Sequence, residues 1–136
     1  MTYFLAKSEP GVYSIDNLKQ DGKTLWDGVT NAQAVRAIRA MQPGDRVFVY
    51  HSGGVSAVVG FADVITGGRD DAANPKSAVV DLAYGGRLEP PTSLADVKQS
   101  GKFEDWALVR QSRLSTMEAP AEFVEWMRAR YPTTKI

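Results

Sequence analysis

Frequent glycine and proline residues between short apolar segments place the strongest constraint on the fold. Most of these segments are bounded by turn-forming residues, which is typical of β-strands. The segments predicted to be strands are residues 3–7, 46–51, 57–65 and 78–88. Gly53-Gly54 and Gly85-Gly86 are predicted to form hairpin turns, and the polar segment 67–77 is predicted to be a loop. Residues 108–109 are predicted to be extended.

Helical patterns in the sequence are few and short. Ser14, Asn31 and Ser93 are suitable N-cap residues for three helices, and Pro120 suits the first turn of a fourth. The side chains that this last helix is predicted to bury are those of Phe123, Val124 and Met127. Because strands and helices do not alternate regularly, parallel strand–helix–strand units are not expected. The pattern predicts an α+β fold, a small mixed β-barrel flanked by short helices.

The length and composition of the chain predict one ordinary globular domain that spans residues 1–136. The 136 residues are 43% hydrophobic and 24% charged, and no linker divides them. Cysteine is absent, which excludes disulfides, thiolate catalysis and cysteine-ligated zinc. The single histidine argues against a metal site, and no cofactor is expected. No apolar run reaches the roughly 18 residues of a membrane span, so we expect a cytoplasmic protein without a membrane partner.

The charge balance limits the kinds of nucleic-acid binding that the chain can support. Sixteen basic and 16 acidic residues give a formal net charge of zero, whereas a nonspecific duplex binder usually carries a basic excess. A small selective pocket needs only local positive charge. The sequence contains no phosphate-binding glycine loop, HExxH motif, EF-hand or nucleophile elbow, so the common catalytic motifs are excluded.

Three clusters of polar and aromatic residues lie where predicted elements end. Lys7-Ser8-Glu9-Pro10 closes the first strand, and Tyr50-His51-Ser52 closes another. Trp26-Asp27-Gly28-Val29 leads to Asn31, which places an aromatic ring beside an amide at a predicted helix start. Each cluster also has a simpler interpretation: a solvated strand end, a surface hairpin, and a core tryptophan followed by a helix cap.

Taken together, these motifs resemble those of the EVE domain family. The same order includes residues 41–45 and the segment Arg110-Gln111-Ser112-Arg113-Leu114-Ser115, so the resemblance runs from Tyr3 to Ser115. It implies a PUA-like fold, a small β-barrel flanked by helices and close to the YTH and ASCH domains. It also implies a pocket for a modified base of DNA or RNA, which is the expected partner.

The chemistry of the matched residues suits a base pocket of this kind. Trp26 can stack on an extruded base, and Asn31 and Ser8 can form hydrogen bonds with the base edge. The glycine at position 28 lets the backbone approach a ligand closely. Candidates for phosphate contacts are Lys7, His51, Arg110 and Arg113, although Arg113 could instead pair with Glu9. The full set of predicted ligand-binding residues is Lys7, Ser8, Glu9, Trp26, Gly28, Val29, Asn31, Tyr50, His51, Ser52, Arg110, Arg113, Leu114 and Ser115.

Three positions depart from the family pattern. Thr30 and Val35 stand where the family commonly has arginine, and Ala32 stands where it commonly has an aromatic residue. The two missing cations predict a weaker grip on the phosphate backbone. The missing aromatic ring predicts a wider or less complete cage around the base.

Two other functions are compatible with the sequence. One is a small metal-independent ribonuclease similar to ASCH domains, in which Lys7 and His51 supply acid–base chemistry and Arg113 stabilises phosphate charge. The other is a regulatory module whose pocket holds a different small ligand. The base reader needs no catalytic residue, so RNA cleavage discriminates the first alternative from it.

Overall fold

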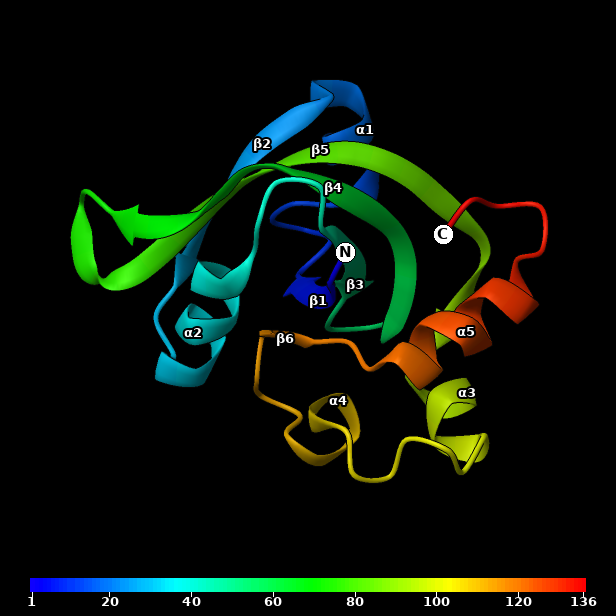
Figure 1. Cartoon of the computed structure of the whole chain (residues 1–136). Helices are drawn as coiled ribbons and strands as arrows, with labels where there is room; N and C mark the ends of the chain where they lie inside the picture. Colours follow the sequence, from blue (N-terminus) through cyan, green and yellow to red (C-terminus); the bar gives the residue numbers. More distant parts are fainter.

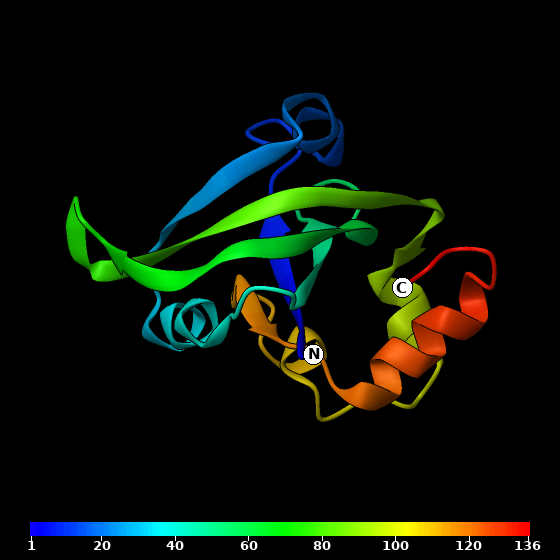
Figure 2. The ribbon, with the colours of Figure 1, turned by 45° about the horizontal axis from the view of Figure 1, so that its top comes forward.

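One six-stranded sheet organises the chain, and the computed structural model describes all residues from Met1 to Ile136 (Figures 1 and 2). Its strands are β1 (Tyr3–Ser8), β2 (Lys23–Val29), β3 (Arg46–His51), β4 (Ala57–Asp71), β5 (Asn74–Ser93) and β6 (Thr116–Glu118). Their order is β2-β5-β4-β3-β1-β6, with β1 and β3 parallel and all other pairs antiparallel. The α+β class is therefore confirmed. The sheet curls but does not close, because β2 and β6 are its free edges.

Five short helices flank the sheet: α1 (Ile15–Asp21), α2 (Ala32–Ala40), α3 (Leu94–Gln99), α4 (Ala107–Arg110) and α5 (Ala121–Arg130). The three predicted N-caps are confirmed, because Ser14, Asn31 and Ser93 each accept a backbone N–H of the helix that follows. Pro120 directly precedes α5. No helix has both the length and the apolar character needed to cross a membrane.

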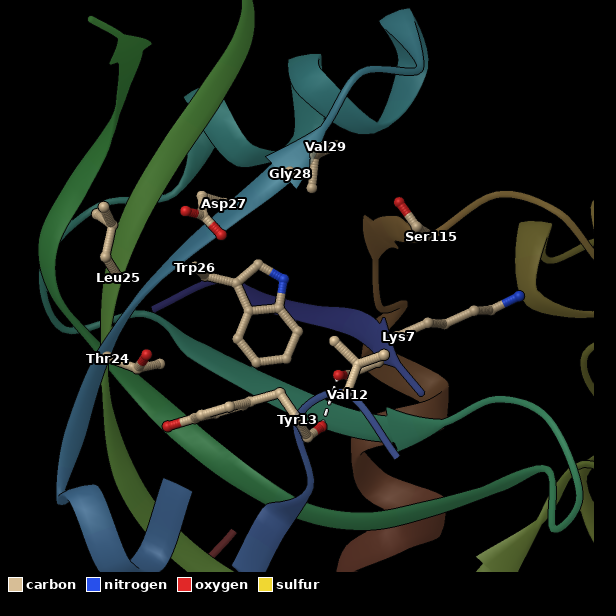
Figure 3. Close-up of a pocket in the computed structure, with 11 residues that line it drawn as sticks. Lys7, Val12, Tyr13, Thr24, Leu25, Trp26, Asp27, Gly28, Val29 and Ser115 are labelled. Atoms are coloured by element: carbon tan, nitrogen blue, oxygen red, sulfur yellow. Dashed lines mark hydrogen bonds between the residues drawn. The ribbon is translucent and has the colours of Figure 1, made fainter. Parts of the chain in front are cut away.

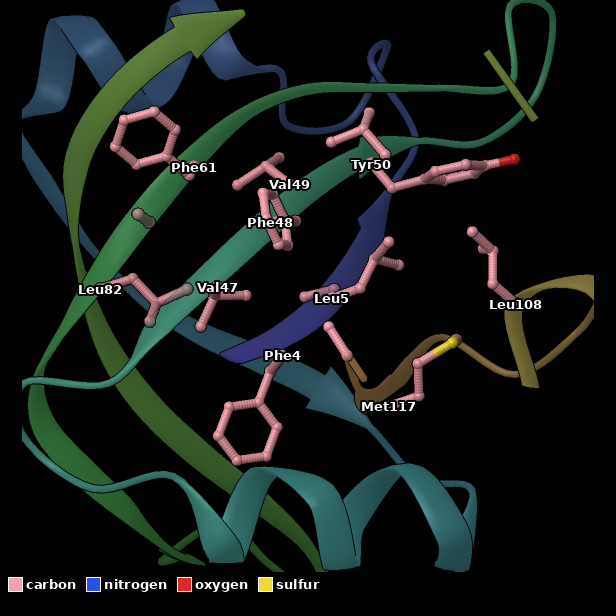
Figure 4. Packing of buried hydrophobic residues seen from close by; sticks show 14 of the residues in the cluster. Phe4, Leu5, Val47, Phe48, Val49, Tyr50, Phe61, Leu82, Leu108 and Met117 are labelled. Atoms are coloured by element: carbon pink, nitrogen blue, oxygen red, sulfur yellow. The ribbon is translucent and has the colours of Figure 1, made fainter. Parts of the chain in front are cut away.

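The hydrophobic core lies between the curled sheet and the helices. Phe4 of β1 points toward α2 (Figure 4), and the predicted burial of Phe123, Val124 and Met127 in α5 is confirmed. The ring of Phe123 lies 5.3 Å from that of Phe48 and 4.5 Å from that of Trp106, measured between centroids. This aromatic cluster joins the C-terminal helix to the centre of the sheet.

The predicted secondary structure is wrong in two segments, 67–77 and 108–109, and it lacks strands β2 and β6. Residues 67–77 are not a loop, since β4 and β5 continue through most of them as a long paired arm (Figure 1). Backbone pairs such as Arg69↔Val79 hold this arm, and backbone pairing does not require apolar side chains. Residues 108–109 lie in the four-residue helix α4, which is too short to show a helical period in the sequence.

Of the two glycine pairs predicted to form hairpin turns, only one does so. Gly53 and Gly54 form the predicted turn, and both have a positive φ, 79° and 75°. Gly85 and Gly86 instead lie inside β5, where a side chain would collide with the ring of Phe61 at 2.6 Å and 2.8 Å. Glycine is required there for close packing rather than for a turn.

Candidate functional site

A cavity of about 400 Å³ opens between the end of β1, the turn after it, and edge strand β2 (Figure 3). This volume lies within the usual range of small-ligand pockets, roughly 300–1,000 Å³. The residues that line it are Lys7, Ser8, Val12, Tyr13, Thr24, Leu25, Trp26, Asp27, Gly28, Val29 and Ser115. Six of them belong to the predicted ligand-binding set.

Parallel pairing of β1 with β3 positions one wall of the cavity. The two strands are in register as far as Ser8↔His51, and the chain then turns back at Glu9. The Glu9 carbonyl accepts hydrogen bonds from the backbone N–H groups of Val12 and Tyr13, both at 2.9 Å. The Ser8 hydroxyl donates to the Tyr13 carbonyl at 2.6 Å. These bonds hold the turn against the strand end.

Trp26 forms the aromatic wall of the cavity. Its side chain is 8% exposed, and the ring of Tyr13 packs edge-on against it at 6.4 Å between centroids. The indole N–H has no partner within the chain. Since no side-chain nitrogen or oxygen is both buried and unpaired, this N–H is open to the cavity, where Figure 3 shows it. Trp26 therefore offers both an aromatic surface and a hydrogen-bond donor.

Gly28 gives the cavity a wall of accessible backbone. It lies in an irregularity of the pairing between β2 and β5, where the register shifts between Trp26 and Val29. Its φ of +79° is a conformation that side chains disfavour, so a glycine is needed. The irregularity leaves Asp27 and Gly28 without partners in the β2–β5 register, and both residues line the cavity.

Lys7 supplies positive charge at the cavity wall. Its ammonium donates to the Ser112 carbonyl at 3.1 Å and lies 5.4 Å from the centroid of the Tyr50 ring. Partial burial lowers the pKa of Lys7 and raises the pKa of the Tyr50 hydroxyl, because both charged forms lose hydration. Lys7 therefore bridges the cavity and the segment that contains Ser112.

His51 lies next to the cavity but does not line it. Its Nε2 accepts the backbone N–H of Ile15 at 3.0 Å, at the start of α1. A ring nitrogen that accepts a hydrogen bond carries no proton, so the imidazole is neutral in this arrangement. Burial lowers the pKa of His51 below its ordinary value of 6.5, because the charged imidazolium loses hydration. The ring therefore links β3 to α1.

This contact predicts a pH dependence of stability. Because the folded-state pKa of His51 is lower than 6.5, the unfolded chain binds more protons as pH falls through that value. The stabilisation by neutral His51 is complete above about pH 7.5 and is lost progressively as pH falls through 6.5 toward the lowered pKa of the folded state. Urea unfolding across this range should show less loss in His51→Gln than in the wild type. Identical pH profiles would contradict the assignment.

A second hollow of about 310 Å³ lies beside the first and contains four more of the predicted residues. It is lined by Asn31 and by the segment from Arg110 to Leu114. Asn31 thus does not share the cavity of Trp26 and Ser8, because its amide oxygen caps α2 by accepting from Gln33 and Ala34. Lys7 connects the two hollows, because it lines the first and its ammonium donates to the carbonyl of Ser112 in the second. Ser115, three residues after Ser112, lines the first cavity.

The two arginines of the second hollow differ in their contacts. Arg110 donates to the Glu104 carbonyl at 3.2 Å and pairs with Asp105 at 3.3 Å. Arg113 is exposed and forms no ion pair, so the alternative pairing with Glu9 is absent. Its guanidinium is free to meet an anion.

Tyr50 and Ser52, like Glu9 and His51, line neither of the two hollows. Tyr50 and Leu114 are buried, at 3% and 3% exposed, and the Ser52 N–H donates to the Ser8 carbonyl at 3.0 Å. No group of three or more His, Cys, Asp or Glu side chains is arranged to hold a metal ion. The cavity residues that the sequence prediction missed are Val12, Tyr13, Thr24, Leu25 and Asp27. The alternation of Thr24, Leu25 and Trp26 is the signal of a strand that could have revealed some of them.

Comparison with known proteins matches the EVE domain profile to residues 2–130. The chain belongs to the EVE domain family. Thymocyte nuclear protein 1 of Danio rerio is 31% identical over 162 aligned residues, which cover 91% of this EVE domain chain and 69% of that protein.

Solved structures share the fold of this EVE domain. A crystal structure of an Agrobacterium tumefaciens protein superposes with a TM-score of 0.88 at 36% identity, and covers 95% of this chain and 92% of the other. Human THYN1, solved in complex with DNA that contains 5-methylcytosine, superposes with a TM-score of 0.86 at 24% identity. That alignment covers 99% of this chain and 100% of the other. The PUA-like architecture is therefore confirmed.

Proposed function

We propose that this EVE domain binds DNA and holds a modified base in the Trp26 cavity. The observation that carries the proposal is the half-apolar cavity of about 400 Å³, in which an indole ring and an unpaired indole N–H face the same space. The human THYN1 complex with 5-methylcytosine DNA supports it, since that protein has the same fold. Modified DNA is therefore the first partner to test, with RNA as a second.

The cavity wall matches the needs of an extruded base. Stacking on an aromatic ring contributes roughly 1–3 kcal/mol per base and does not depend on sequence. Directed hydrogen bonds then select the base edge, and the Trp26 indole N–H and the backbone at Gly28 supply them. Val29 adds apolar surface on which a methyl group of the base can pack.

Phosphate contacts fit the second hollow rather than the cavity. Arg113 is unpaired there, Arg110 is exposed beside it, and Lys7 lies between the two hollows. A strand that placed one base against Trp26 would bring its neighbouring phosphates toward these cations. Because the net charge of the chain is zero, this local cluster has to supply the electrostatic attraction.

Titration with matched oligonucleotides tests the proposal. Intrinsic tryptophan fluorescence should fall when DNA with a modified base is added, and affinity should exceed that for unmodified DNA by about tenfold or more, as a pocket that recognises one methyl group provides. The panel includes 5-methylcytosine, N6-methyladenine and the corresponding RNA. Equal affinity for every modified and unmodified oligonucleotide would contradict the proposal.

Lys7 is expected to act on the phosphate backbone rather than on the base. Lys7→Ala should weaken the binding of oligonucleotides more than the binding of the free modified nucleoside. The slope of log affinity against log salt concentration should decrease in magnitude by about one. Thr30→Arg is the reverse change at an exposed position, and should strengthen oligonucleotide binding without altering base preference. A uniform loss for nucleoside and oligonucleotide in Lys7→Ala would assign Lys7 to the base pocket instead.

The partly buried Lys7 also supports a second candidate, the metal-independent ribonuclease. An amine with a lowered pKa beside a cavity suits acid–base chemistry. The neutral, hydrogen-bonded His51 argues against it, because that nitrogen is already occupied by Ile15. RNA cleavage by the wild type that is lost in Lys7→Ala would favour the ribonuclease over the reader.

A further inference from the structure

Val12 occupies an unusual place for an apolar side chain. It is 78% exposed, yet it lines the mouth of the Trp26 cavity. Single exposed valines are common on protein surfaces and need no explanation by themselves. Val12 differs from these because it lies at the opening of the cavity, where a bound ligand would contact it.

The turn that carries Val12 is held in place from several sides. The backbone N–H of Val12 donates to the Glu9 carbonyl at 2.9 Å, and the Tyr13 carbonyl accepts the Ser8 hydroxyl at 2.6 Å. The Tyr13 hydroxyl donates to Asp21 at 2.8 Å, and its ring packs against Trp26. The Val12 side chain therefore projects from a supported turn at the rim of the cavity.

A base inside a duplex cannot reach a cavity of this kind without leaving the stack. Extrusion opens a gap between the flanking base pairs, and an apolar side chain that enters the gap replaces part of the lost stacking. We propose that Val12 is this wedge, and that the substrate of the site is double-stranded DNA from which the modified base is extruded. This inference rests on the proposed function.

Val55 provides a matched control on the neighbouring turn. It is 72% exposed and follows β3 as Val12 follows β1, but it does not line the cavity. Because β1 and β3 are parallel partners up to Ser8↔His51, both turns leave the same end of the sheet. Serine at either position removes an equally exposed apolar side chain, and only the Val12 change affects the cavity mouth.

Binding to paired and single-stranded forms of one modified oligonucleotide tests the wedge. Val12→Ser should weaken binding to the 5-methylcytosine duplex by about tenfold, which corresponds to about 1.4 kcal/mol. Binding to the single strand should change by less than about twofold, because no gap has to be filled there. Val12→Leu should retain duplex binding, and Val55→Ser should leave both affinities unchanged. A 2-aminopurine beside the modified base should brighten on wild-type binding and brighten less with Val12→Ser.

The outcomes separate this inference from the function on which it rests. Failure of the wild type to bind any modified oligonucleotide overturns the proposed function. If the wild type binds modified single strands but Val12→Ser leaves the duplex affinity unchanged, the wedge alone is overturned. Equal losses for duplex and single strand make Val12 a part of the pocket wall and overturn the wedge, and so does an equal loss in Val55→Ser.

Discussion

Replacement of Phe123 with alanine is expected to lower the free energy of unfolding by about 3–5 kcal/mol. The side chain is fully buried in α5, and its ring contacts the rings of Phe48, Phe103 and Trp106 at 5.3, 5.4 and 4.5 Å between centroids. The substitution removes these contacts and leaves a cavity that the surrounding sheet and helices fill only partly. Urea unfolding followed by circular dichroism measures the change.

Ile65→Ala is the control for this prediction. Ile65 lies on β4 at 44% exposed, so its truncation should change stability by much less than that of Phe123. A loss under about 1 kcal/mol in Phe123→Ala would mean that the C-terminal helix is peripheral to the core.

Replacement of Trp26 with alanine is expected to weaken binding of modified DNA by about 5- to 150-fold, the equivalent of roughly 1–3 kcal/mol of base stacking. The ring forms the aromatic wall of the cavity, and no other tryptophan lines it. Because Trp26 is also part of the core at 8% exposed, thermal unfolding must show that the variant is folded at the temperature of the titration. Fluorescence quenching by the ligand should disappear together with the affinity.

Two variants make the interpretation specific. Trp26→Phe keeps an aromatic face but removes the indole N–H, so it should retain part of the affinity. Trp126→Phe alters a half-buried ring of α5 outside the cavity, and should retain both affinity and quenching. A folded Trp26→Ala protein with wild-type affinity for every ligand would leave the proposed site without its aromatic wall.

Local sequence signals predicted much of this molecule. Capping residues hydrogen-bond within three residues of themselves, so Ser14, Asn31 and Ser93 could be assigned without any tertiary information. The apolar pattern of α5 was equally local, and so was the polar and aromatic character of the segments around Lys7 and Trp26. The order of these motifs was sufficient to indicate the EVE domain family.

Which of those residues meet in space was decided by the tertiary structure. Parallel pairing of β1 with β3 and the pairing of edge strand β2 with β5 join segments far apart in sequence, and no local pattern specifies such partners. These pairings bring Ser8 and Trp26 to one cavity, leave Asn31 in the next hollow, and bind His51 to the start of α1. Local sequence signals were sufficient for the helix caps, for α5 and for the chemistry of the motifs, but not for edge strand β2 or the paired arm of β4 and β5. Long-range backbone pairing determined which of the motifs form the site.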